Sequence, residues 1–290
     1  MITPTAAHTT AGACSSHAMR RCRLGPLAVA TALVALLWAC TAPAPDAEVP
    51  APASPTEPSL EPVPVPAPVP SPAAPAEPAD TLPAAVLPGH PALVARAEGE
   101  LDLYDRPGAD AVSRTLPATT AFGSPRALLV TAVGDEDDDG WLEVLLPVRP
   151  NGTTGWIRTD AVELRTVAWH VTVDLDAREL AVLDGDEVVL TAPAAIGDAD
   201  HPTPTGLFFI IDKLDTADPD GPYGPYALGL SAWSDVLTEF AGGDGQVGIH
   251  GTDAPSSIGR AASHGCIRVE NAVIEELARL LPLGTPVLIS

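Results

Sequence analysis

A proline-rich tract limits where this chain can fold. Residues 41–80 contain 14 prolines, mixed with Ala, Val, Glu and Ser. Proline fixes φ and lacks a backbone N–H, so the tract forms neither a helix nor a sheet interior and favours extended polyproline II. We therefore expect a disordered, Pro/Ala-rich linker over residues 41–90 and a folded body after it. A ligand for a proline-recognising domain is the alternative role, and a spacer is the favoured one.

Residues 1–40 are typical of an export signal. A positive segment at 19–23 precedes an apolar run from Leu24 to Ala39, which has the length of a signal-peptide core and is short for a membrane span. The run ends Leu-Leu-Trp-Ala-Cys, which resembles the lipobox of bacterial lipoproteins and implies lipidation of Cys40. We expect export to the cell envelope and anchoring to the outer face of the cytoplasmic membrane. A plain secreted product cut a few residues after Cys40 and a start at Met19 are the alternatives.

The charge balance excludes one class of partner. The chain has 15 basic and 38 acidic residues and a formal net charge of -23. Because such a surface repels a phosphate backbone, no nucleic acid is expected to bind. Attraction to a cationic partner is one explanation of this acidity, and solubility outside a cell is the favoured one.

Cysteine usage singles out one thiol. Of the four cysteines, Cys14 and Cys22 leave with the signal, and Cys40 is lipidated or lies near the cut. Cys266 is then the only thiol of the folded body, so no structural disulfide is expected there. An unpaired cysteine in an exported protein indicates a reactive thiol. An inert, buried cysteine that packs as a small hydrophobe is the alternative.

Residues 91–165 are expected to form a small β domain. Short apolar runs separated by turn residues recur every 8 to 12 positions. The expected strands are Leu101–Tyr104, Ala127–Val133, Trp141–Leu145 and Gly155–Arg158. The last two resemble the closing strands of a bacterial SH3-like barrel, which implies cell-wall binding or packing beside a catalytic domain. The acidic run 135–140 lacks the ligand spacing of a calcium loop and is expected to be a hairpin tip.

Residues 166–290 are also expected to consist mostly of strands. Residues 179–183 and 187–190 read as a hairpin across Asp184-Gly185. Further strands are expected at 167–173, 207–211, 246–250 and 286–289. Residues 215–245, rich in Gly, Pro and aromatics, are expected to be a long loop that forms a cleft wall or lid. Tyr223 and Tyr226 in this loop either contact substrate or pack within the loop.

One amphipathic helix is expected at 271–281. Its apolar residues recur at helical spacing, Asn271 is the expected N-cap, and Pro282 ends it. Cys266 lies a few residues before the positive end of this helix. That position, and an imidazolium nearby, predict a thiol pKa below the free value of about 8.5.

The candidate active site lies between His250 and Arg268. A thiol at Cys266, imidazoles at His250 and His264, and a glycine turn at Gly265 come together within nineteen positions. These groups can make a thiolate, place a base beside it and hold an oxyanion. The residues therefore predict a cysteine enzyme that acts on acyl groups. His170 is expected to be structural or exposed.

The motif resembles that of the L,D-transpeptidases with a YkuD-type catalytic domain. His250 is followed after thirteen residues by His264-Gly265-Cys266, with Thr203-Pro204-Thr205-Gly206 upstream. The resemblance spans residues 167 to 289. It implies a β-sandwich catalytic domain at 166–290 with one or two short helices. Together with the separate SH3-like resemblance at 91–165, the expected fold is mainly β.

The resemblance also implies an activity and its residues. L,D-transpeptidases crosslink peptidoglycan stem peptides through a cysteine thioester and release D-alanine, without a cofactor or a metal. Cys266 would be the nucleophile and His250 the base, held by the Gly251 carbonyl, while backbone N–H groups of His264, Gly265 and Cys266 would hold the oxyanion. His264 either tunes the thiolate or only fills the turn. The expected substrate-binding residues are Gly251, Ser263, Arg268 and Tyr226.

Three alternatives remain at this point. An L,D-carboxypeptidase or endopeptidase would use the same residues with water as the acceptor. A zinc-binding module would use His250, His264 and Cys266 as ligands, although three ligands without a CxxC pair make a poor structural site. A cell-wall-binding protein with an inactive catalytic domain is the third.

Overall fold

A computed structural model describes residues 89–135, 140–239 and 243–290. The expected signal peptide, Cys40 and nearly all of the linker lie outside the described residues, as do positions 136–139 of the acidic run. Among the described residues, no helix has both the length and the apolar character needed to span a membrane.

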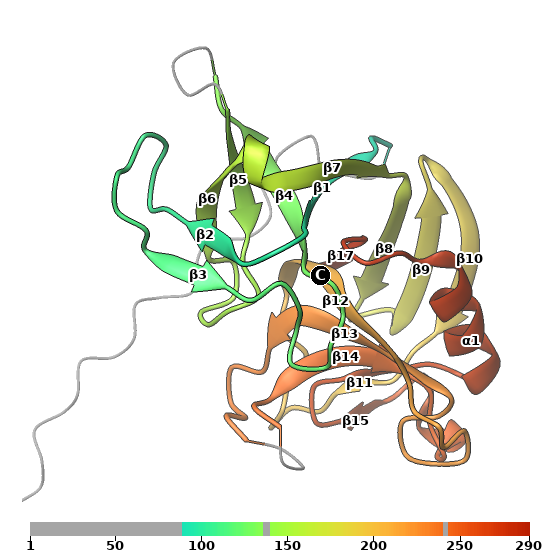
Figure 1. The fold of residues 1–290 in the computed structure, drawn as a ribbon. Coiled ribbons are helices and arrows are strands. Elements are labelled where there is room, and N and C mark those ends of the chain that lie inside the picture. The colour runs from blue at the N-terminus through green and yellow to red at the C-terminus, as the bar shows by residue number, and fades with distance from the viewer. Residues whose placement is uncertain (1–88, 136–139, 240–242) are drawn as a thin grey trace, which may run out of the picture. The chain divides into compact units, whose positions relative to one another are not determined.

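The N-terminal part is an antiparallel five-stranded sheet in the order β6-β5-β4-β1-β7 (Figure 1). Its strands are β1 Ala92–Ala97, β4 Ala127–Val133, β5 Trp141–Leu145, β6 Thr154–Arg158 and β7 Val162–Val167. Strands β2 (Leu101–Leu103) and β3 (Arg114–Leu116) form a separate pair. The strands expected at 127–133, 141–145 and 155–158 fall in the five-stranded sheet, whereas the strand expected at Leu101–Tyr104 belongs to the separate pair. The SH3-like barrel remains a prediction. The expected domain boundary after residue 165 falls inside β7.

The C-terminal part is one mixed eight-stranded sheet in the order β10-β9-β8-β17-β12-β13-β14-β16. Its strands are β8 Trp169–Asp174, β9 Glu179–Asp184, β10 Glu187–Pro193, β12 Gly206–Asp215, β13 Tyr226–Trp233, β14 Gln246–His250, β16 Ile267–Arg268 and β17 Pro286–Ile289. Short strands β11 (Ile196–Gly197) and β15 (Ala261–Ser263) pair beside it. The expected β-sandwich is thus built from a single sheet that curls, so that β8–β10 run across β12–β14 (Figure 1).

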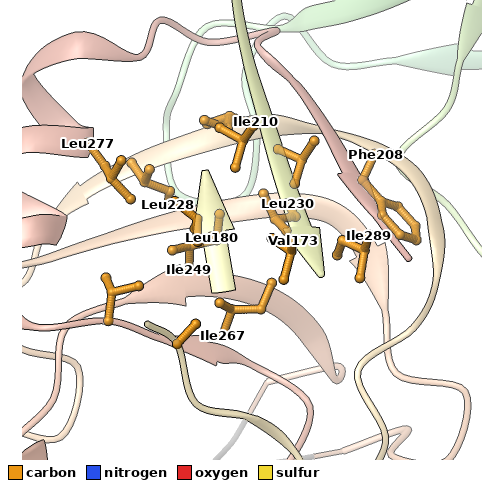
Figure 2. Close-up of a cluster of buried hydrophobic side chains, with 14 of the residues drawn as sticks. Val173, Leu180, Phe208, Ile210, Leu228, Leu230, Ile249, Ile267, Leu277 and Ile289 are labelled. Carbon is orange, nitrogen blue, oxygen red and sulfur yellow. The ribbon is translucent and has the colours of Figure 1, made fainter. Parts of the chain in front are cut away.

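The core lies inside this curl. Val173 and Leu180 from one half meet Ile210 and Leu230 from the other (Figure 2). All four are at most 1% exposed. Because each strand contributes alternate residues to this face, the opposite face is left for the active site and for the N-terminal sheet.

Strand β13 corrects the prediction of a long loop at 215–245. Leu228, Leu230 and Ala232 alternate inward along β13, and each is fully buried. The strand pairs with β12 on one side and β14 on the other, so it lies in the centre of the sheet. Glycines and prolines on both sides of the strand concealed this alternation in the sequence.

The single α-helix among the described residues, α1, spans Asn271–Leu280. Ile274 and Leu277 are buried, as expected from its spacing. The expected N-cap was wrong: Glu270 occupies that position without a capping side-chain bond. The Asn271 side chain instead accepts from the Thr252 N–H at 2.8 Å and donates to the Pro219 carbonyl at 3.1 Å. It therefore ties the helix to two loops beside the site.

Strand β12 is buried on both faces. Phe208 and Ile210 belong to the core of the C-terminal sheet, whereas Phe209 and Ile211 pack with Leu128, Leu142 and other residues of the N-terminal sheet. This burial on both faces explains why residues 207–211 are all apolar, because alternate side chains enter the two cores and none faces solvent fully. The Thr120 hydroxyl donates to the buried Asp212 carboxylate at 2.5 Å across the same contact.

Candidate active site

The parallel pair β14 and β16 brings the thiol and the imidazole to one face. Ile249 lies opposite Ile267, and both are fully buried in the core. Side chains alternate along a strand, so His250 and Cys266, the sequence neighbours of these isoleucines, point to the other face. Both residues line one pocket of about 260 Å³. The structure therefore unites the two residues that the sequence singled out.

The pocket is formed by residues from three segments. They are Pro222 and Tyr223 before β13, a group after β13 and along β14, and His264, Cys266 and Arg268 around the turn that leads into β16. The second group comprises Ser234, Leu237, Gly245, Gln246, Val247 and His250. Five of these residues, on either side of β13, belong to the segment 215–245 that was expected to be a loop. The prediction that this segment forms a cleft wall therefore holds for its parts before and after β13.

His250 is held as a neutral ring. Its Nδ1 lies 2.5 Å from the Gly251 carbonyl oxygen, as expected. A carbonyl only accepts, so Nδ1 carries the proton and Nε2 keeps its lone pair. His250 is 4% exposed, and this burial lowers the pKa of its imidazole to about 4. The Gly251 hydrogen bond opposes the shift, and the charge of Arg268 adds a smaller lowering. At neutral pH His250 is therefore available as a base.

The Cys266 thiol corrects a prediction. Burial raises its pKa above the ordinary value, although a backbone hydrogen bond from Gly248 and the charge of Arg268 act in the opposite direction. The expected lowering does not prevail, because burial of the thiol outweighs both of these opposing effects. The expected imidazolium is also missing at neutral pH. The pair thus rests as a thiol and a neutral imidazole, and a proton can pass to His250 as the sulfur attacks.

Internal hydrogen bonds brace the turn that carries Cys266. The Ser263 hydroxyl donates to the Cys266 carbonyl at 2.5 Å and accepts from the Gly265 N–H at 3.1 Å. Buried Thr203 donates to the Gly265 carbonyl at 2.9 Å and accepts from the Gly197 N–H at 2.8 Å. The sequence shows Thr203 only as part of a motif and gives no signal of this bracing role.

These contacts correct two predictions. Ser263 is 0% exposed, so it stabilises the turn and does not reach a substrate. The Gly265 N–H is engaged by Ser263 and is not aimed at an oxyanion. Gly265 is required by its φ of +114°, since a Cβ there would meet nothing closer than 3.7 Å.

The second histidine, His264, lies at the exposed side of the turn. Its ring is 4.9 Å from that of His201, which in turn contacts Asp198 at 3.1 Å. His264 also lines the pocket. Neither of its two expected roles is decided by this position.

Arg268 lies in the pocket beside His250, its register partner on β14. No ion pair found among the described residues includes it, and its Nε is buried without a hydrogen-bond partner there. Arg268 is thus placed to attract an anionic group in the pocket.

Tyr223, not Tyr226, lies at the reactive pair. The Tyr223 ring is 4.8 Å from the His250 ring. Tyr226 begins β13 and packs against the core, and it is absent from the pocket lining. Gly251 is buried too, and its contribution is the carbonyl that holds His250.

His170 is structural. It is 2% exposed, and its Nδ1 lies 3.0 Å from the Ala168 carbonyl. No group of three or more His, Cys, Asp or Glu side chains within the described ranges is arranged to hold a metal ion. The zinc-module alternative therefore has no cluster to support it there.

The fold and site define a mainly β protein with a cysteine–histidine pair in a pocket. A model of the L,D-transpeptidase catalytic domain, YkuD, matches residues 168–289. Proteins named L,D-transpeptidase YkuD from Bacillus subtilis and Bacillus licheniformis are each 39% identical over 125 residues, which are 43% of this chain and 68% and 67% of those proteins. The chain therefore belongs to the L,D-transpeptidase family and carries its YkuD-type catalytic domain.

Solved structures give further similarities. Bd1075 of Bdellovibrio bacteriovorus is 31% identical, with 42% of this chain and 48% of that chain covered and a TM-score of 0.34. An L,D-transpeptidase from Mycobacterium smegmatis is 18% identical, with 58% and 91% covered and a TM-score of 0.35.

Proposed function

We propose that this protein is a peptidoglycan L,D-transpeptidase that crosslinks stem peptides through a thioester on Cys266. The observation that carries the proposal is that His250, at the end of β14, and Cys266, in the turn directly before β16, line one pocket. Family membership supports peptidoglycan as the substrate.

The proposed mechanism follows from the neutral pair. The Cys266 sulfur attacks the carbonyl before the terminal D-alanine while Nε2 of His250 takes the thiol proton. His250 then returns that proton to the leaving amine, so D-alanine departs and a thioester remains. The amine of a second stem attacks the thioester, forms the new amide and regenerates the thiol. The Cys266 backbone N–H is our candidate donor to the oxyanion.

Further roles belong to the same proposal. Arg268 binds the carboxylate of the stem, since its charge faces the pocket. We also propose that the protein is exported, is anchored through lipid on Cys40, and acts in the cell envelope. The N-terminal domain is proposed to be SH3-like.

Purified protein and tetrapeptide stems test the reaction. Mass spectrometry should find crosslinked dimers and free D-alanine with the wild type and neither with Cys266→Ala. The alternative, a carboxypeptidase or endopeptidase, predicts tripeptide without dimers, because only the acceptor differs. Tripeptide alone would replace crosslinking by hydrolysis, and no product would reject both.

An active-site label tests the nucleophile separately. An L,D-transpeptidase, LdtMt1, has been solved in complex with imipenem. We expect imipenem to add its mass to the intact wild-type protein and not to Cys266→Ala. A mass shift that persists in the variant would remove Cys266 from its proposed role.

A further inference from the structure

A loop of the N-terminal sheet contacts the substrate pocket. Arg149 and Asn151 lie between β5 and β6, about 85 positions before the residues they contact. The contacted residues are Trp233, Ser234, Leu237 and Asp244. They include or adjoin Ser234, Leu237, Gly245 and Gln246, which line the pocket. We call these four residues the pocket wall.

Arg149 binds both ends of the pocket wall. Its Nη1 donates to the Ser234 carbonyl at 2.5 Å, and its Nη2 donates to the carbonyls of Leu237 at 3.1 Å and Asp244 at 2.8 Å. A planar guanidinium can serve several acceptors in fixed directions, which a lysine cannot reproduce. One side chain thus fixes the start and the end of the wall relative to each other.

Asn151 holds the strand end that leads into the wall. Its side-chain amide donates to the Trp233 carbonyl at 2.8 Å, and its side-chain oxygen accepts from the Trp233 N–H at 2.9 Å. The pair copies the hydrogen-bonding pattern of a strand neighbour. The end of β13 is therefore fixed from the N-terminal sheet.

The exposed part of the wall is held mainly by hydrogen bonds. The Ser234 hydroxyl accepts from the N–H groups of Val236 and Leu237 at 3.3 and 3.0 Å, and Gln246, in β14, donates to the Leu230 carbonyl at 3.0 Å. Asp235 and Val236 are exposed, and Leu237 is only half-buried, so apolar burial contributes little there. The Ser234 N–H donates to the Gly245 carbonyl at 2.9 Å, which closes the wall on itself. A Cβ on Gly245 would lie 2.0 Å from the Leu237 carbonyl oxygen and 3.0 Å from Nη2 of Arg149. Segments with few buried contacts open most easily, so the exposed stretch at 235–237 depends most on the bonds that Arg149 and Asn151 add from the N-terminal sheet.

We propose that Arg149 and Asn151 are positioning residues that set the substrate-binding wall of the pocket. The N-terminal sheet then supplies part of the active-site architecture, whatever it binds elsewhere. The identity of the substrate rests on the proposed function above. Neither residue touches the reacting atoms, and both act through the wall.

Kinetics with the full chain test this role. Arg149→Ala should raise KM for a tetrapeptide stem about tenfold and change kcat by less than about threefold, since binding is lost before chemistry. Alkylation of Cys266 by iodoacetamide, a small probe that needs no wall, should stay within about twofold of the wild type. Arg165→Ala is the matched control: Arg165 lies on β7 of the same sheet, and its one ion-pair partner within the described ranges is exposed Glu163.

Hydrogen exchange tests the same role without a substrate. Backbone amides at 234–237 and 244–246 should exchange about tenfold faster in Arg149→Ala than in the wild type or in Arg165→Ala. Asn151→Ala should act in the same direction at 233–234 and serves as the second variant if Arg149→Ala folds poorly. If wild-type protein turns over no stem, the proposed function fails while exchange still decides the positioning role.

Two results would overturn the proposal. Unchanged KM and unchanged exchange in both variants would show that the wall holds its position unaided. Equal losses in kcat, in alkylation rate and in melting temperature would show a general structural role without specific positioning.

Discussion

At the scale of single residues, the site depends on two neutral groups. The buried imidazole of His250 has a pKa of about 4, and burial raises the pKa of the Cys266 thiol. Many cysteine enzymes store a thiolate beside an imidazolium, whereas these shifts favour proton transfer during attack. A thiol at rest is also less open to oxidation.

The pH dependence should reveal this resting state. His250 is neutral above its folded pKa, so kcat/KM should stay level as pH falls from 7 towards 5 and decline only as it approaches about 4. Iodoacetamide alkylation of Cys266 should rise about tenfold per pH unit from pH 6 to 8, without a plateau at acid pH. Such a plateau, absent in His250→Ala, would instead demonstrate a stored thiolate–imidazolium pair.

Thr203 should matter more than its distance from the chemistry suggests. Thr203→Val keeps the side-chain volume and removes both hydrogen bonds that brace the Gly265 turn. Because the buried Gly197 N–H and Gly265 carbonyl lose a partner, we expect a loss of about 1–3 kcal/mol in the free energy of unfolding. Urea unfolding measures it, with exposed Thr205→Val as the control. Equal stability of the two variants would contradict the bracing role.

At the scale of elements, α1 serves the site through its first residue. Asn271 bridges the loops at Thr252 and Pro219, and its side-chain oxygen lies 2.4 Å from the place that a Cβ on Gly251 or on Gly224 would take. The helix thereby fixes the segment that follows His250.

Replacing Asn271 should loosen that segment. Asn271→Ala is expected to lower the free energy of unfolding by about 1–2 kcal/mol and to slow acylation of Cys266 by imipenem. Calorimetry and intact mass against time measure the two effects. Glu275→Ala, exposed on the same helix, should change neither. Unaltered acylation in Asn271→Ala would limit Asn271 to a stabilising role.

Local patterns explain which elements the sequence could predict. Alternation and turn residues predicted β4, β5, β14 and β17 with the observed bounds, and helical spacing predicted α1. Strand β13 was missed because the Gly- and Pro-rich segments around it resemble a loop. Cys266 and His250 were found because their motif is short. Arg149 was missed because its contacts lie about 85 residues away along the chain. The pKa shifts of His250 and Cys266 could not be predicted either, because burial is a tertiary property.

At the scale of the whole described chain, the two sheets share one strand as a boundary. Phe209 and Ile211 complete the core of the N-terminal sheet from β12. Stability of one sheet should therefore depend on the other, although the sequence suggests two separate domains.

Unfolding should reflect this shared boundary. Phe209→Ala is expected to cost about 3–5 kcal/mol and to leave a single transition in which both sheets unfold together. Tryptophan fluorescence and circular dichroism should give coincident urea curves. Phe122→Ala, 61% exposed in the N-terminal part, is the control. Two separated transitions in the variant would show that the sheets fold independently.

The double-sided burial of β12 also bears on how such proteins can be recombined. A chimera that joins this catalytic sheet to the N-terminal region of another protein must cover Phe209 and Ile211 and must replace the Arg149 side chain at the rim of the pocket. Grafts cut inside β7 would leave both demands unmet. A working chimera therefore has to take over both the surface that packs on β12 and the loop that carries Arg149.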